Sequence, residues 1–133
     1  MTDPNTDAAA LISQMDPVLG EGPYRFVLVT RELAPQVLGA AIGTFREAEG
    51  ITAIIPSALA QELELSGLDL AQITLQVVSD LADVGLTAAV SGVLAEAAIA
   101  CNVVAAFHHD HLFVPWDRKD EAIGLLKELQ RSA

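Results

Sequence analysis

The feature that most limits the fold is the order of patterns in the second half of this 133-residue sequence. In "QITLQVVSD" (72–80), apolar and polar residues alternate, which is typical of a strand with one packed face. An alanine- and glycine-rich segment, 84–98, predicts a helix that packs closely against a sheet. Two strand-type runs, 102–107 and 111–115, and an amphipathic helix over 117–130 follow. The resulting β-α-β-β-α order is the ferredoxin-like arrangement without its last strand.

The first half contains similar elements in a less regular pattern. "YRFVLVT" (24–30) alternates like a strand, and "GTFREAEGITAIIP" (43–56) predicts two strands joined by a turn at Glu49 and Gly50. Pro56 and Ser57 are typical of the start of a helix. A short helix is also expected over residues 6–15, before the first strand.

The stretch "SGLDL" (66–70) is the best internal boundary. It predicts a first unit over residues 1–66, which includes the N-terminal helix, and a second unit over residues 67–133. Compared with a complete ferredoxin-like unit, the second unit lacks one strand and the first unit contains one additional strand. We therefore expect an α+β fold in which the two units share or exchange strands.

The charge and cysteine content exclude several classes of protein. The formal net charge is −11, and the seven Lys and Arg residues are scattered, so neither nucleic acid nor an anionic membrane surface is an expected partner. Cys101 is the only cysteine and no signal peptide is evident, which predicts a reducing cytoplasm. The apolar stretch 84–107 includes Glu96 and Asn102, which argues against a transmembrane helix.

Residues 108–111 bring three histidines and an aspartate together. His109 and His111 share a face if they lie on a strand, and could bind a metal, although a third or fourth protein ligand would be needed. Alternatively, Asp110 accepts backbone N–H groups in a polar turn, or the turn faces another ligand. No G-x-S-x-G motif and no phosphate-binding loop is present, so we expect neither an enzyme nor a cofactor.

The stretch "DVGLTAAVSGVLAEAAIACNVVAAFHHDHLFVP" (83–115) resembles an ACT domain in its glycine-containing strand–helix turn, helix, I-x-x-N segment and short hairpin. Together with "HDHLFVP", the segment "TFREAEGITAIIP" (44–56) is similar to the small bacterial tandem-ACT proteins and to the animal cytosolic arginine sensor. The resemblance extends from about Met15 to Leu129.

This resemblance implies two ferredoxin-like ACT units, each a βαββαβ arrangement with an antiparallel sheet. It also implies regulatory binding of a small ligand, usually an amino acid, at an interface between units. Family ligands lie near the strand–helix turn. The residues so implicated lie at that turn, on the hairpin, and on the first unit's counterpart of the hairpin: Asp83, Gly85, Leu86 and Thr87; Phe107, His109 and Asp110; and Glu49, Gly50 and Ile51.

These residue types suit an amino-acid zwitterion. Free N–H groups at the start of the 84–98 helix could bind the ligand carboxylate, and Gly85 would allow close approach. Asp83, Asp110, Glu47 or Glu49 could accept hydrogen bonds from the ammonium group or from a basic side chain. The alternative is structural: Asp83 only caps the helix, and Gly85 only permits close packing.

We therefore predict a cytoplasmic, free-standing regulatory module that binds an amino acid, with homodimerisation as a further expectation. The alternative is a metal-binding module or metal-dependent hydrolase centred on His109 and His111. A third hypothesis is an association domain without a ligand. The sequence identifies neither the amino acid nor the regulated protein.

Overall fold

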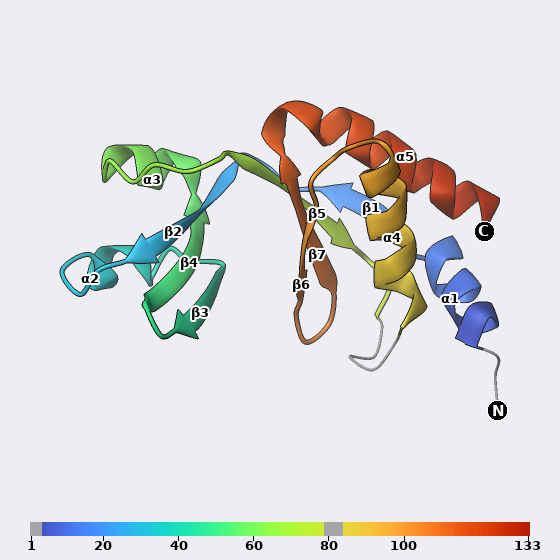
Figure 1. Cartoon of the computed structure of the whole chain (residues 1–133), viewed down its shortest axis with the longest axis horizontal. Coiled ribbons are helices and arrows are strands. Elements are labelled where there is room, and N and C mark those ends of the chain that lie inside the picture. Colours follow the sequence, from blue (N-terminus) through green and yellow to red (C-terminus); the bar gives the residue numbers. More distant parts are fainter. Residues whose placement is uncertain (1–3, 79–83) are drawn as a thin grey trace. The chain divides into compact units, whose positions relative to one another are not determined.

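The computed structural model describes residues 4–78 and 84–133. The chain forms two compact units, which Figure 1 shows. The discontinuous unit consists of Met1–Glu21 and Ala71–Ala133, and the inserted unit is Gly22–Leu70. The predicted division into a first ACT-like unit over residues 1–66 and a second over residues 67–133 stays a prediction.

The discontinuous unit contains the β-α-β-β-α order predicted for the second half. Four strands pair in the order β1, β5, β7, β6, and the helices α1, α4 and α5 lie on one side of them (Figure 1). The elements are α1 (Pro4–Ser13), β1 (Pro17–Leu19), β5 (Leu70–Leu75), α4 (Gly85–Glu96), β6 (Asn102–Ala105), β7 (Asp110–Pro115), the 3-10 helix η1 (Trp116–Arg118) and α5 (Lys119–Ser132).

The strand missing from the second half is supplied by β1. Pro17, Val18 and Leu19 pair antiparallel with Leu75, Thr74 and Ile73. The backbone N–H of Gln76 donates to the carbonyl of Met15 at 2.6 Å and extends this pairing. The N-terminal segment therefore completes a ferredoxin-like unit whose other strands lie far away in the sequence, as expected if the two halves share strands.

The core of the discontinuous unit lies between its three helices and one face of its strands. Ile73 and Leu75 project from β5 into this core, which shows that the alternating pattern was correctly interpreted. Ala122 and Leu126 on α5 are fully buried, as the amphipathic pattern predicts. Each fully buried leucine contributes about 1.5–3 kcal/mol to stability. The core side chains are Ile12, Met15, Ala71, Ile73, Leu75, Leu86, Val90, Leu94, Ile99, Leu112, Val114, Ala122 and Leu126.

Two predicted elements are longer than the observed ones. The strand expected over 72–80 ends at Leu75. The helix expected to residue 98 ends at Glu96, because Ala98 has a φ of 58°, in the left-handed region. The N–H of Ile99 then donates to the carbonyl of Leu94 at 2.9 Å, which satisfies a helix-end carbonyl in the manner of a Schellman motif.

The inserted unit is a three-stranded antiparallel sheet in the order β3, β4, β2, with two short helices. Its core is made of small side chains on one sheet face, and its helices pack there. The elements are β2 (Tyr24–Val29), α2 (Ala34–Val37), β3 (Gly43–Glu47), β4 (Gly50–Pro56) and α3 (Ser57–Glu62). The core residues are Val27, Val29, Val37, Ala53, Ile55 and Ala60.

Among the described residues, no helix combines the length and apolar composition that a membrane span needs. The apolar stretch 84–107 instead divides into α4 and β6.

Candidate functional site

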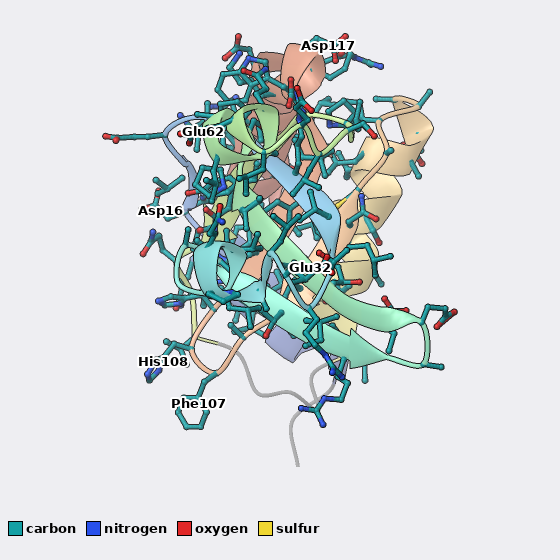
Figure 2. The ribbon with its side chains drawn as sticks, turned by 90° about the vertical axis from the view of Figure 1, so that its left-hand side faces the viewer. Asp16, Glu32, Glu62, Phe107, His108 and Asp117 are labelled. Atoms are coloured by element: carbon teal, nitrogen blue, oxygen red, sulfur yellow. The ribbon has the colours of Figure 1, made fainter. Side chains whose placement is uncertain are left out.

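The β6–β7 hairpin holds most of the predicted histidine cluster. Its turn covers residues 106–109 and is closed by the N–H of Ala106, which donates to the carbonyl of His109 at 3.0 Å. Phe107 is 87% exposed, and the His108 ring packs edge-on against it with centroids 4.9 Å apart. Figure 2 shows both side chains projecting outward from the turn. Asp110 is the half-buried first residue of β7.

His109 is the unusual residue of this turn. Its Nδ1 atom is buried and has no hydrogen-bond partner within residues 4–78 and 84–133. An unsatisfied buried polar atom costs about 1–3 kcal/mol, so native proteins contain few of them. A ligand that donates a hydrogen bond to this nitrogen would remove the penalty.

The His111 side chain forms hydrogen bonds with polar side chains of β5. Its Nδ1 atom lies 2.9 Å from Thr74 Oγ1 and 3.2 Å from Gln72 Nε2. Because an amide nitrogen only donates, Nδ1 accepts from Gln72 and the ring proton lies on Nε2. Burial and the nearby His109 lower the pKa of His111, and Asp110 partly offsets them. The lowered pKa favours the neutral form of the His111 ring at neutral pH.

This environment bears on the metal-binding hypothesis. One nitrogen of His111 is already used by Thr74 and Gln72. Within the part of the chain that the structure describes, no group of three or more His, Cys, Asp or Glu side chains is arranged to hold a metal ion. The described residues thus offer no donor set for the two-histidine site.

The first turn of α4 carries three further predicted residues. A Cβ atom on Gly85 would lie 2.3 Å from the Cβ of Ala8, so the glycine allows α1 to pack against α4. Leu86 is 2% exposed and belongs to the core, whereas Thr87 is exposed. The helix N-cap is Val84, which has no capping side chain, and Asp83 lies outside the described residues.

The structure brings the hairpin turn and the start of α4 to the same end of the discontinuous unit (Figure 1). The other three predicted residues lie in the inserted unit, at the β3–β4 turn, which is the topological counterpart of the β6–β7 hairpin. Glu49 is exposed, Gly50 has a φ of 146°, and Ile51 packs at the edge of the inserted core. A φ of this size favours glycine, so Gly50 has a structural reason to be present.

The sequence did not reveal a polar arrangement around Arg25 in the inserted unit. Arg25 Nε donates to Asp69 Oδ1 at 2.7 Å, and Nη1 donates to the carbonyl of Leu65 at 3.0 Å. The hydrogen bond from Arg25 holds the pKa of the Asp69 carboxyl below its usual value. An arginine within an otherwise apolar strand was the available signal, but Asp69, 44 positions away, could not be matched to it.

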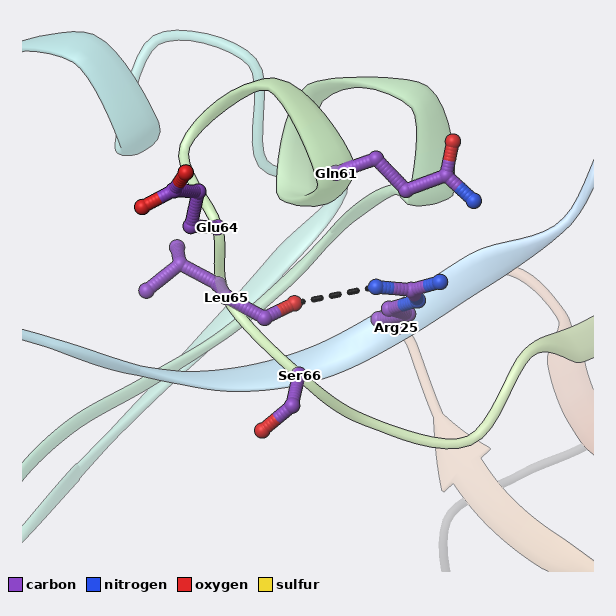
Figure 3. Close-up of a pocket in the computed structure, with 5 residues that line it drawn as sticks. All are labelled: Arg25, Gln61, Glu64, Leu65 and Ser66. Carbon is purple, nitrogen blue, oxygen red and sulfur yellow. Dashed lines mark hydrogen bonds between the residues drawn. The ribbon is translucent and has the colours of Figure 1, made fainter.

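A pocket of about 260 Å³ adjoins this arginine, lined by Arg25, Gln61, Glu64, Leu65 and Ser66 (Figure 3). Its residues come from β2 and from the end of α3 with the following loop. The pocket lies entirely within the inserted unit.

Comparison with known proteins identifies the family. Two ACT-domain family models match the chain, one over residues 4–72 and the other over residues 68–128. The chain belongs to the ACT-domain family. A Vibrio cholerae protein of unknown function, described as a possible transport protein, is 34% identical to this ACT-domain protein. Their match covers 96% of this chain and 99% of the other, with a TM-score of 0.83.

Two more solved structures share the fold at lower identity. A protein from Agrobacterium tumefaciens is 18% identical, with a TM-score of 0.68 and coverage of 86% of this chain and 87% of its own. The ligand-free regulatory subunit of aspartate kinase from Thermus thermophilus is 12% identical, with a TM-score of 0.61 and coverage of 85% and 95%. These two likenesses concern the fold alone. A comparison with curated proteins finds no match.

The predicted tandem ACT family and α+β fold are thus confirmed. ACT domains are regulatory modules, and this chain contains two of them in tandem.

Proposed function

We propose that this ACT-domain protein binds an amino acid at the hairpin end of the discontinuous unit and acts as a regulator through that binding. The proposed site combines the 106–109 turn with the first turn of α4. The observation that carries the proposal is the buried Nδ1 atom of His109, which lacks a hydrogen-bond partner in the described part of the chain.

The chemistry of this end suits an α-amino acid. The first N–H groups of α4 have no partners within the helix, and they lie at the positive end of its dipole, which favours a carboxylate. In the tautomer with the ring proton on Nε2, His109 Nδ1 could accept an N–H of the ligand ammonium group. Asp110, next in sequence, adds negative charge on the same strand. Phe107 offers an exposed aromatic surface for an apolar ligand side chain.

Regulation would follow from differential binding. A ligand shifts a conformational equilibrium only by as much as it prefers one state over the other. A ligand that joins α4 to the hairpin favours the conformation in which both lie close together. A cytoplasmic location and self-association belong to the same proposal. The free Cys101 thiol fits a reducing compartment, and β3, which within the described residues pairs with β4 alone, offers a strand edge for association.

Thermal unfolding with each of the twenty amino acids tests this proposal. A ligand present at about 100 times its dissociation constant adds about 2.7 kcal/mol to the free energy of unfolding, which raises the Tm by several degrees. We expect one amino acid or a few related ones to raise the Tm. The increase should be lost in His109→Ala and retained in His108→Ala, a matched change on the exposed neighbouring histidine.

Metal-stripped protein with Zn²⁺, Ni²⁺ and Mn²⁺ provides the competing result. A rise in Tm with metal alone, lost in the His109→Ala/His111→Ala double variant, would contradict amino-acid binding and favour the metal hypothesis. Absence of any rise with amino acids would also contradict the proposal.

A further inference from the structure

We propose that one face of the inserted sheet binds a segment of a partner protein that carries a large apolar side chain beside a lysine or arginine. The docking surface consists of Leu28, Phe45, Glu47 and Thr52. This inference concerns the inserted unit alone and is separate from the amino-acid site at the His109 hairpin. It describes the chemistry of a protein that a regulatory module of this kind would contact.

Strand register brings the residues of the docking surface together. The strands β2, β4 and β3 lie side by side in this order (Figure 1). Thr52 on β4 is directly opposite Leu28 on β2 and directly opposite Phe45 on β3. Opposed residues of antiparallel strands project to the same face of a sheet. Since the neighbouring Val27 and Ala53 are buried in the core of the inserted unit, this row lies on the other face.

Two large apolar side chains of this row are exposed. Phe45 is 71% exposed and Leu28 is 56% exposed. The Leu28 side chain lies over Gly50, where a Cβ atom would be 3.0 Å from the leucine Cδ1. The next row of the same face is covered, because Ile54 is only 6% exposed. The exposed apolar surface is therefore confined to the part of the face near the β3–β4 turn, and exposed apolar groups that adjoin one another are typical of interaction sites.

Glu47 adds a fixed negative charge to this apolar surface. It follows Phe45 by two positions on β3, so both side chains project to the same face. Thr52 Oγ1 donates to Glu47 Oε1 at 2.6 Å, which holds the carboxylate beside the row. Within residues 4–78 and 84–133, no cationic side chain forms a salt bridge with Glu47. The carboxylate can therefore accept a charge-assisted hydrogen bond from a lysine or arginine of the partner.

Net charge favours a basic partner over a second copy of this chain. The inserted unit contains six Asp and Glu residues and three Arg residues, so its formal net charge is −3, and that of the whole chain is −11. Two such chains repel each other, whereas a segment with lysine or arginine is attracted to the surface and oriented by it. The exposed Phe45 is the type of side chain that contributes most to binding once a partner covers it.

Titration of the full-length ¹⁵N-labelled protein with capped peptides tests this surface. One peptide contains Lys-Leu-Phe-Lys, a second has glutamate in place of both lysines, and a third has serine in place of the leucine and phenylalanine. We expect saturable NMR shifts of the amides of residues 28, 45, 47 and 52 with the first peptide. The other two should bind at least about tenfold more weakly, because one loses the charge-assisted contact and the other loses the apolar burial.

Two matched pairs of variants separate this surface from general effects of charge and apolar area. Leu28→Ser removes an apolar group of the row, and Leu68→Ser makes the same change at another leucine of the inserted unit, which is 64% exposed. Glu47→Gln removes the carboxylate, and Glu62→Gln makes the same change on α3. All four residues are exposed, so the variants should fold. Leu28→Ser and Glu47→Gln should each weaken binding of the lysine peptide about tenfold, and the controls should leave it within about twofold.

Any of four results would overturn the inference. These are no saturable shift at the row with the lysine peptide, equally tight binding of the glutamate peptide, equal effects within each pair of variants, or a dimer that Leu28→Ser dissociates in analytical ultracentrifugation. The last result would assign the surface to a second copy. Shifts at the row that persist in His109→Ala would support the docking surface whether or not the hairpin binds an amino acid.

Discussion

The two units are built on the same plan but differ in how they are stabilised. The buried core of the discontinuous unit, under three helices, is mostly leucine and isoleucine, with one methionine, two valines and two alanines. The core of the inserted unit consists of valines, alanines and one isoleucine, with only short helices beside it. Hydrophobic stabilisation scales with the apolar area buried. Most of the folding free energy should therefore reside in the discontinuous unit.

The two units also differ in the charge of the polar side chains that join their strands. In the discontinuous unit, His111 forms hydrogen bonds with Thr74 and Gln72. In the inserted unit, a charged pair, Arg25 and Asp69, ties the loop before β5 to β2. In the unit with the large core, a histidine joins two strands by neutral hydrogen bonds. In the unit with the small core, an ion pair joins a strand to a loop. Ligand binding that orders a weakly stabilised unit has a larger relative effect there.

Removal of a core leucine should have the largest effect. Leu94→Ala, in the middle of the discontinuous core, should lower the free energy of unfolding by about 2–5 kcal/mol. Leu28→Ala, on a leucine that is 56% exposed in the inserted unit, should change it by less than about 0.5 kcal/mol. Hydrogen exchange then shows where the loss occurs. We expect amides of β7 and α5 to lose more protection than those of β2 and β4; equal losses would mean that the units unfold together.

Two glycines of α4 test whether α1 belongs to the discontinuous unit. Gly85→Ala places a Cβ atom 2.3 Å from the Cβ of Ala8 and should cost about 1–3 kcal/mol, because α1 must move. Gly92→Ala meets nothing within 4 Å and should stabilise the helix by about 0.5–1 kcal/mol. Chemical denaturation measures both. If Gly85→Ala were as stable as Gly92→Ala, α1 would not pack against α4 as described.

The pH dependence of the discontinuous unit should reflect His111. Its pKa is lowered in the folded state, so the unfolded chain binds more protons and stability rises with pH. This contribution is complete above about pH 6.5, the ordinary pKa of histidine, and is lost as the pH falls through the lowered pKa. His111→Gln should reduce the slope of stability against pH below 6.5, with His108→Gln as control. An unchanged slope in His111→Gln would contradict the assigned environment.

The stability of the inserted unit should also depend on pH, by a smaller amount and at lower pH. The pKa of Asp69 is lowered by Arg25, so the stability that this pair contributes is present above the ordinary carboxyl pKa and is lost as the pH falls through the lowered value. Asp69→Asn should therefore weaken the protection of the β2 amides against hydrogen exchange at neutral pH. In this variant, the protection should no longer fall when the pH is lowered into the acidic range. Since Asp69 is partly exposed, added salt should reduce the effect. The same acid response in wild type and variant would argue against this pair.

The regions predicted well and poorly differ for physical reasons. Local periodicity was sufficient for β5, α4, the hairpin and α5, because each buries one face along a continuous segment. The three-residue strand β1, which begins at Pro17, is too short to show alternation, and its partner lies more than fifty positions away. The contacts of His111 with Thr74 and Gln72 depend on strand register, which no local pattern contains. Arg25 was missed for the same reason.

Hydrogen–deuterium exchange of the full chain, with and without the amino acid that raises the Tm most, tests the central claim most directly. We expect added protection in the peptides that cover the start of α4 and residues 105–112, and loss of that protection in His109→Ala. Protection confined to other peptides, or unchanged in His109→Ala, would contradict the hairpin as the amino-acid site.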